Sequence, residues 1–353
     1  MGVFRFSNAV SDIRKFIQTY TVLYSELKKT KNFTHDDATD TLIKHGLVSS
    51  SGAIGEEAKK RSRRPDRSRD SLYNQHKMYS EVYRMLGWYK PGAKRINFNF
   101  TEFGEYIFDA FEASNSILVN HFEFSAIHIV APNPLVEVKG RNILRPFPLI
   151  LKLMNDMDGV ITRDEIILGV LNCQNDRVNG IYEQTLGYLR SLRGAYARVK
   201  SEIKRVKREN GINSDATLQN YTRFPLASLR FLSWAENKLN RDIYDRSIVA
   251  YHITDKGKEK AREYRVYADI RNEELQSFPK EIKASYALLM NYINFEKIGY
   301  KIPEAATSFI EELTEKSKPI LNKYRIKDKR KILYSAIQES QPSELKEADK
   351  LDK

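Results

Sequence analysis

The stretch "RSRDSLYNQHKMYSEVYRMLGWYKPGAKRINFNFTEFGEYIFDAF" (residues 67–111) decides the expected fold. Apolar side chains recur at helical spacing through residues 71–86, and Gly87 ends this pattern as a helix C-terminus often requires. A Pro-Gly turn then separates two short strand-like pieces. Thr101 begins a further helix, because threonine is a favoured N-cap. The stretch therefore predicts a helix, a two-stranded wing and a second helix.

The same order of segments occurs twice in the chain. Helix-like segments at 11–28 and 35–45 precede the first copy, which gives the order helix, helix, helix, wing, helix of a winged helix. The second copy begins with an apolar helix at 145–154. Its next helix opens with the capping box Thr162-x-x-Glu165.

Both copies also leave the wing in the same way. The first has Thr101-x-x-Gly104 after a strand, and the second has Thr254-x-x-Gly257. The threonine is expected to cap the following helix, and the glycine to allow tight packing against the strand. We therefore predict a mainly α protein with small β-wings, built from tandem winged-helix (helix-turn-helix) modules plus a helical C-terminal region.

The pattern also predicts where each part begins and ends. The predicted parts are a first winged-helix module at 1–120 with a basic loop at 59–69, a connector at 121–144, a second winged-helix module at 145–270, a helical C-terminal region at 271–340 and a frayed tail at 341–353.

Composition restricts the class of protein. The formal net charge is +13 and the pI about 9.4, an excess typical of proteins that meet phosphate. The single Cys173 excludes a disulfide scaffold and favours a reducing cytoplasm. No apolar run is long enough to span a membrane, and residues 59–69 lack apolar membrane anchors. We predict a cytoplasmic protein that binds double-stranded DNA and no membrane.

Basic side chains lie where a helix entering a DNA groove would need them. Seven of the eleven residues at 59–69 are basic, and arginine suits phosphate and guanine edges better than lysine does. A second basic group ends the helix-like segment 177–209. The predicted phosphate-contacting residues are Lys59, Lys60, Arg61, Arg63, Arg64, Arg67, Arg69, Lys94, Arg95, Arg198, Lys204, Arg205 and Arg208. The predicted base-reading residues are Arg69, Ser71, Asn74, Lys77, Arg223 and Ser228.

Three segments resemble the recognition regions of type IIS restriction endonucleases and related strand-nicking enzymes, particularly AlwI-like ones. They are the basic helix-wing-"TEFG" unit at 67–107, the block "LRPFPLILKLMNDMDGVITRDEIILGVL" with its continuation to 193, and the helix-wing unit at 217–264. The resemblance implies winged-helix subdomains that read a short asymmetric site. It also implies a separate nuclease domain that cuts at a fixed distance.

The chain departs from that family in its nuclease. A PD-(D/E)xK site needs an Asp and an acidic-x-Lys pair on neighbouring strands to hold Mg²⁺, and residues beyond 270 show no such arrangement. The local match Glu137-x-Lys139 most simply belongs to an extended connector. The six histidines form no metal-binding motif. The predicted function is the specificity subunit or region of a type II (IIS-like) restriction endonuclease. Any Mg²⁺ then belongs to an associated nuclease.

Two other functions stay open from the sequence. A winged-helix transcriptional regulator or replication initiator would bind a repeated or palindromic site without a nuclease partner. A complete Mg²⁺-dependent nuclease would use a diverged site at Glu137 and Lys139.

Overall fold

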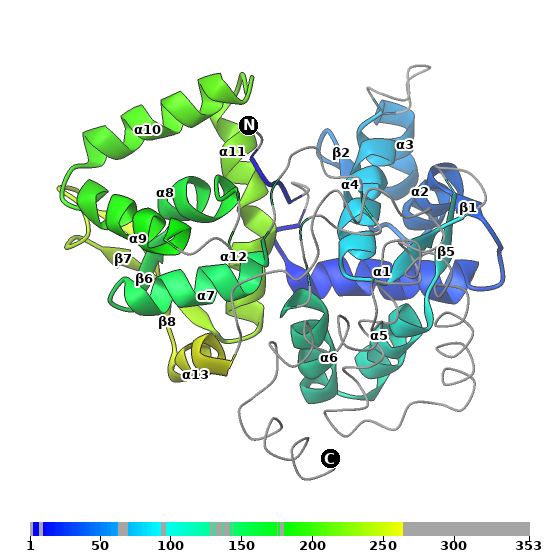
Figure 1. Ribbon diagram of the computed structural model, residues 1–353. Coiled ribbons are helices and arrows are strands. Elements are labelled where there is room, and N and C mark those ends of the chain that lie inside the picture. Colours follow the sequence, from blue (N-terminus) through cyan, green and yellow to red (C-terminus); the bar gives the residue numbers. More distant parts are fainter. Residues whose placement is uncertain are drawn as a thin grey trace, which may run out of the picture.

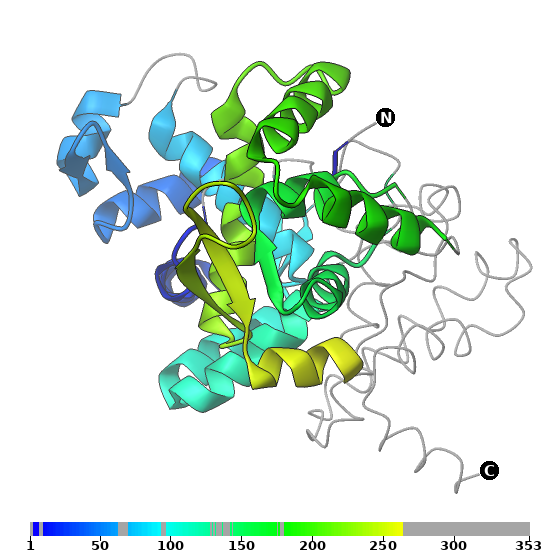
Figure 2. The ribbon, with the colours of Figure 1, turned by 90° about the vertical axis from the view of Figure 1, so that its left-hand side faces the viewer.

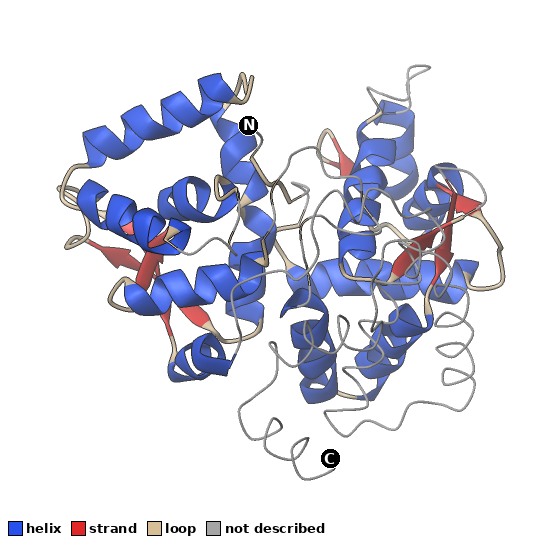
Figure 3. Ribbon diagram, viewed as in Figure 1, coloured by secondary structure: helices blue, strands red, loops and turns tan. Residues whose placement is uncertain are grey.

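The structure is a computed structural model that describes residues 3–6, 10–62, 70–92, 97–127, 129, 131, 136, 142, 144–174, 176 and 180–263. The described part is mainly helical with small antiparallel sheets (Figure 3). This confirms the expected mainly α class with short strands. The predicted regions at 271–340 and 341–353 lie outside the described residues.

The first half of the described chain combines a three-stranded sheet and a separate two-stranded sheet, β2 with β3, with helices (Figure 1). The strands β1, β5 and β4 are hydrogen-bonded in that order. The elements are α1 (Ile13–Leu27), β1 (Phe33–Thr34), α2 (His35–Lys44), β2 (Ser49–Ser50), β3 (Ala53–Ile54), α3 (Gly55–Ser62), α4 (Ser71–Met85), β4 (Tyr89–Pro91), β5 (Asn97–Phe100), α5 (Glu102–Ala113) and α6 (Asn115–Ile127).

The second half repeats this plan with a longer insertion. Its sheet has the order β6, β8, β7. The elements are α7 (Pro146–Asp156), β6 (Val160–Thr162), α8 (Arg163–Glu165) with a π-helical continuation (Ile166–Leu171), α9 (Ile181–Leu192), α10 (Tyr196–Glu209), α11 (Asp215–Tyr221), α12 (Arg223–Phe231), β7 (Ala235–Asn240), β8 (Ile248–Ile253) and α13 (Asp255–Glu263).

The two halves therefore share one topology. In each, a helix leads into a short strand, and that strand pairs antiparallel with the second strand of a later hairpin (β1 with β5, β6 with β8). In each, extra elements lie between the helix after the short strand and the helix before the hairpin. These insertions are β2, β3 and α3 in the first half, and α9, α10 and α11 in the second.

The exit from each hairpin confirms the Thr-x-x-Gly prediction. Thr101 Oγ1 accepts from the Gly104 amide at 2.9 Å, and Thr254 Oγ1 accepts from the Gly257 amide at 3.1 Å. A Cβ atom on Gly104 would lie 2.7 Å from the Trp88 carbonyl oxygen. On Gly257 it would lie 2.2 Å from the corresponding oxygen of Trp234. Only glycine permits this approach of helix to strand.

A tryptophan at the start of each hairpin is a repeated feature that the sequence analysis missed. The indoles of Trp88 and Trp234 are fully buried. The Trp88 amide donates to the Tyr83 carbonyl oxygen at 2.8 Å, and the Trp234 amide donates to that of Leu229 at 2.8 Å. Each tryptophan thus ties the end of a helix to the strand that follows it.

The two halves share a continuous apolar core. Phe16 of α1 lies 6.2 Å from Phe224 of α12, measured between ring centroids, and Phe122 of α6 lies 5.2 Å from Phe231. The buried carboxylate of Glu123 also pairs with two lysines of α13, at 3.4 and 3.0 Å. Because α12 lies between the halves, most of its surface is withdrawn from solvent.

Two predicted boundaries need correction. Residues 177–209 were expected to form one helix, but α9 and α10 are separate, and Gly194 between them adopts a positive φ of 84°. The predicted module boundary at residue 120 falls inside α6.

Candidate nucleic-acid interface

The basic segment after residue 58 is only partly available to a ligand. Lys59 pairs with Asp40 at 3.4 Å, and Arg61 pairs with Glu57 at 3.0 Å. The Lys60 side chain is exposed on α3. Lys59 and Arg61, both predicted to contact phosphates, therefore already have carboxylate partners within the chain. The predicted residues Arg63, Arg64, Arg67, Arg69, Lys94, Arg95, Glu137 and Lys139 lie outside the described residues.

The first turn of α4 is capped by Asp70 and contacts the inserted elements. The Asp70 carboxylate accepts from the amides of Leu72 and Tyr73 at 3.0 and 3.2 Å. The hydroxyl of Ser71 bonds to the hydroxyls of Ser62 and Ser50, which come from α3 and β2. Ser71 therefore needs correction as a base reader, because its polar group is engaged within the protein.

The remaining predicted base readers of α4 differ in exposure. Lys77 is exposed, whereas Asn74 is half-buried. The opposite face of α4 is buried, and it includes Tyr79, Val82 and Tyr83. Contact with a base edge requires an exposed side chain, and of Asn74 and Lys77 it is Lys77 that is exposed.

A pair of buried histidines joins α2 and α4. The Nδ1 atoms of His35 and His76 are 2.9 Å apart, so one ring donates to the other. Burial, with Arg84 and Lys77 nearby, lowers the pKa of His35 to about 4. Burial, His35 and Arg84 hold the pKa of His76 well below its usual value. Both rings are therefore neutral near pH 7, and their positions indicate structural histidines.

Helix α10 presents a basic face. Val199, Ile203 and Val206 point into the core at helical spacing, which leaves Arg198, Lys204 and Arg208 exposed. The Arg198 guanidinium donates to the Ser191 carbonyl oxygen at 3.1 Å. Lys204 and Arg208 lie one turn apart and satisfy the sequence prediction of exposed cations.

Arg205 on the same helix does not satisfy that prediction. Its guanidinium pairs with Glu202 at 2.8 Å and with Glu209 at 2.9 Å. Hydrogen bonds to Glu202 and Glu209 raise the pKa of Arg205. Arg205, predicted to contact phosphate, thus balances two carboxylates of its own helix.

The second predicted reading helix is not presented outward. Six consecutive residues of α12, from Phe224 to Leu229, are buried. Ser228 is fully buried, and its hydroxyl donates to the Phe224 carbonyl oxygen at 2.8 Å. Ser228 cannot reach a base edge in this fold, because the core between the two halves covers it. Arg223, at the start of α12, is exposed.

The two insertions lie on the same side of the molecule. Helix α3 of the first half and helix α10 of the second stand at the top of Figure 1, and both remain at the top in the turned view of Figure 2. The exposed cations of the described residues on these helices are Lys60, Arg61, Arg198, Lys204 and Arg208. We call α3, α4 and α10 the basic side.

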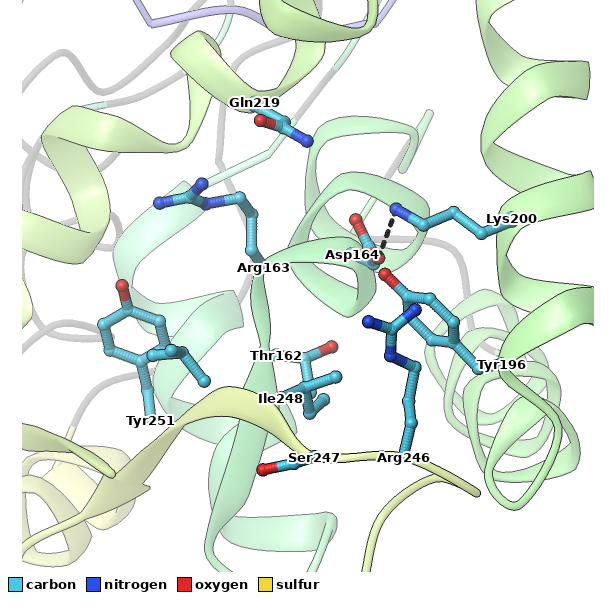
Figure 4. Close-up of a pocket in the computed structure, with 11 residues that line it drawn as sticks. Thr162, Arg163, Asp164, Tyr196, Lys200, Gln219, Arg246, Ser247, Ile248 and Tyr251 are labelled. Atoms are coloured by element: carbon cyan, nitrogen blue, oxygen red, sulfur yellow. Dashed lines mark hydrogen bonds and ion pairs between the residues drawn. The ribbon is translucent and has the colours of Figure 1, made fainter. Parts of the chain in front are cut away.

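A pocket of about 370 Å³ opens beside α10 (Figure 4). Sequence reasoning did not find it, because its walls come from four places in the chain. Its lining residues are Thr162, Arg163, Asp164, Tyr196, Lys200, Gln219, Arg246, Ser247, Ile248, Val249 and Tyr251.

Comparisons with models of known protein families, with curated proteins and with solved structures give no match. Among the described residues, none of the helices is both long and apolar enough to cross a membrane.

Proposed function

We propose that this chain recognises double-stranded DNA through two winged-helix units. The observation that carries the proposal is the repeated sheet order, in which the first short strand pairs with the second strand of the hairpin in both halves. A winged helix has this arrangement, and DNA contact through its third helix and flanking groups is its common use.

The placement of charge supports contact with phosphates on the basic side. Helices α3 and α10, which carry exposed cations, both lie at the top of Figures 1 and 2, and the chain carries a net charge of +13. Because α12 is buried, the second unit would contact DNA through α10. Base reading would fall to α4, with Lys77 as its exposed side chain.

The narrower part of the proposal is a role as the specificity subunit or region of a type IIS-like restriction endonuclease. It depends on the resemblance of three segments to that family, and the nuclease would lie on another chain. The neighbouring reading frames provide a direct check. A methyltransferase and a nuclease gene beside this one would support the assignment, and a lone gene with a palindromic binding site would favour a regulator.

The phosphate contacts are tested with a Lys204→Ala, Arg208→Ala variant. If both cations meet phosphates, the slope of log Kd against log salt flattens by about 1.8. Binding to specific and random duplexes weakens alike, because phosphates carry no sequence information. Fluorescence anisotropy over a salt series measures both effects.

A matched control removes two exposed cations elsewhere, with Lys29→Ala and Lys258→Ala. This control should leave the slope nearly unchanged. An equal flattening in both variants would mean that net charge, and not the basic side, drives binding.

Base reading is tested at Lys77 after the bound site has been selected from random duplexes. Lys77→Ala is expected to cost about 1–3 kcal/mol of discrimination at one base pair and little on random DNA. Competition with a set of sites that each differ at one position locates that base pair. Uniform loss across the set, as expected for Lys204→Ala, would remove Lys77 from the reading surface.

A further inference from the structure

The pocket beside α10 has a charge pattern that no core contact requires. Arg163, Lys200 and Arg246 come from three separate elements and surround the space, with Asp164 as the single carboxylate in the lining (Figure 4). Three cations against one carboxylate leave two positive charges in excess. A phosphate monoester carries about −1.5 to −2 at pH 7, whereas a phosphodiester carries one negative charge. The balance therefore favours a terminal phosphate over an internal one.

The cations are held in place before any ligand arrives. The Arg246 guanidinium lies 4.8 Å from the Tyr196 ring centroid, and the Lys200 ammonium lies 5.0 Å from it. Lys200 also pairs with Asp164 at 3.4 Å. The backbone amide of Tyr196 donates to Asp245 at 3.3 Å, which fixes the β7–β8 loop that carries Arg246. Groups fixed in this way bind an anion without a large ordering cost.

One polar atom in the lining is left without a partner. The Nε atom of Arg163 is buried and makes no hydrogen bond with the described residues. Buried polar groups are normally hydrogen-bonded, so such an atom in a pocket wall indicates a missing acceptor. A phosphate oxygen would provide that acceptor.

The opposite wall is mixed. Figure 4 shows Tyr251 and the Arg163 guanidinium on the side away from Lys200, Arg246 and Tyr196. Ile248 and Val249 also line the space, while Gln219 and Ser247 offer polar groups. The volume of about 370 Å³ lies within the range of small-molecule sites. The pocket thus offers a phosphate cations from two sides, Lys200 and Arg246 on one and Arg163 on the other, and its apolar lining residues leave a wall for a pentose and base.

We propose that this pocket binds the terminal phosphate monoester of a nucleotide, either free or at the end of a nucleic-acid strand. This proposal is independent of duplex recognition on the basic side, because a small nucleotide is enough to test it.

The first experiment compares ligands that differ only in the phosphate. AMP against adenosine is measured by calorimetry, and a short single strand with a 5′-phosphate against the same strand with a 5′-hydroxyl by anisotropy. The phosphorylated form is expected to bind about tenfold tighter or more. If only AMP binds more tightly than its unphosphorylated counterpart, the ligand is a free nucleotide. If only the phosphorylated strand does so, the ligand is the end of a strand. No preference in either pair overturns the proposal.

The second experiment places the effect in the pocket. In the double variant Lys200→Gln, Arg246→Gln, the ratio of affinities for the phosphorylated and unphosphorylated ligands should fall close to one. Arg163→Gln, which changes a different element, should have the same effect. Lys258→Gln removes an exposed cation outside the pocket and should keep the preference. Thermal unfolding verifies that each variant is folded. A preference that survives in both pocket variants would place the phosphate elsewhere. Binding of an unphosphorylated duplex reports on the basic side alone, so the two proposals fail separately.

Discussion

Replacing Arg193 by Met is expected to lower the free energy of unfolding by about 3–5 kcal/mol. The Arg193 Nε donates to Glu165 at 2.9 Å, and its two other nitrogens donate to the carbonyl oxygens of Met157 at 3.1 Å and Val160 at 2.6 Å. The Glu165 side chain is only 1% exposed. Removal of the guanidinium leaves a buried carboxylate without its cation, and the carbonyl oxygens of Met157 and Val160 each lose one donor.

Urea unfolding of three variants separates the buried pair from simple loss of packing. Arg190→Met, an exposed arginine on α9, should cost less than about 1 kcal/mol. Adding Glu165→Gln to Arg193→Met should recover part of the loss, since a neutral amide can still accept from the Thr162 amide. A loss below about 1 kcal/mol for Arg193→Met would show that the carboxylate finds water or another donor.

This network also connects stability to the pocket. Glu165 and Thr162 form the capping box that begins α8, and Arg163 and Asp164 lie between them. The turn that carries two pocket residues is therefore fixed by the capping box and by Arg193. The same variant should weaken phosphate preference in the pocket if it stays folded.

Local features of the fold were predictable because neighbouring residues determine them. The capping box at Thr162 and the two Thr-x-x-Gly helix starts each depend on a few consecutive residues, and all are present. The split between α9 and α10 was missed because Gly194 lies inside an otherwise continuous helical pattern.

The site was less predictable, because exposure depends on residues far apart in the chain. The pattern of α12 gave no sign that α1 and α6 cover it through Phe16 and Phe122. Nothing near Ser71 indicated that the inserted hairpin supplies Ser50 as a partner. A carboxylate close to a run of cations is also easily overlooked in a sequence. Glu57 is an example, because it pairs with Arg61 one helical turn later. The pocket joins residues 162 to 251 and has no continuous sequence signal.

Lowering the pH from about 7.5 to about 5 is expected to destabilise the protein through the buried histidine pair. The pKa of His35 is about 4 in the fold, against about 6.5 in the unfolded chain. Between these values the unfolded state binds more protons, so stability is full above about pH 6.5 and falls as pH falls toward 4. His35 alone should cost about 2 kcal/mol at pH 5 and about 3 kcal/mol at pH 4. His76, whose pKa is also lowered by burial, adds to this loss.

The double variant His35→Phe, His76→Phe isolates this effect in urea unfolding at the two pH values. Replacing both partners of a hydrogen bond by apolar rings of similar shape can be nearly neutral near pH 7. The part of the pH-dependent loss that comes from the pair should then disappear. The part due to His121 should remain, because burial lowers the pKa of His121 to about 4 as well. His45→Gln, which removes an exposed ring bonded to Glu26, is the matched control and should keep the loss from the pair. If the double variant lost as much stability as the wild type between the two pH values, the titrating groups would lie elsewhere, and the pair joining α2 and α4 would be protonated in the folded protein.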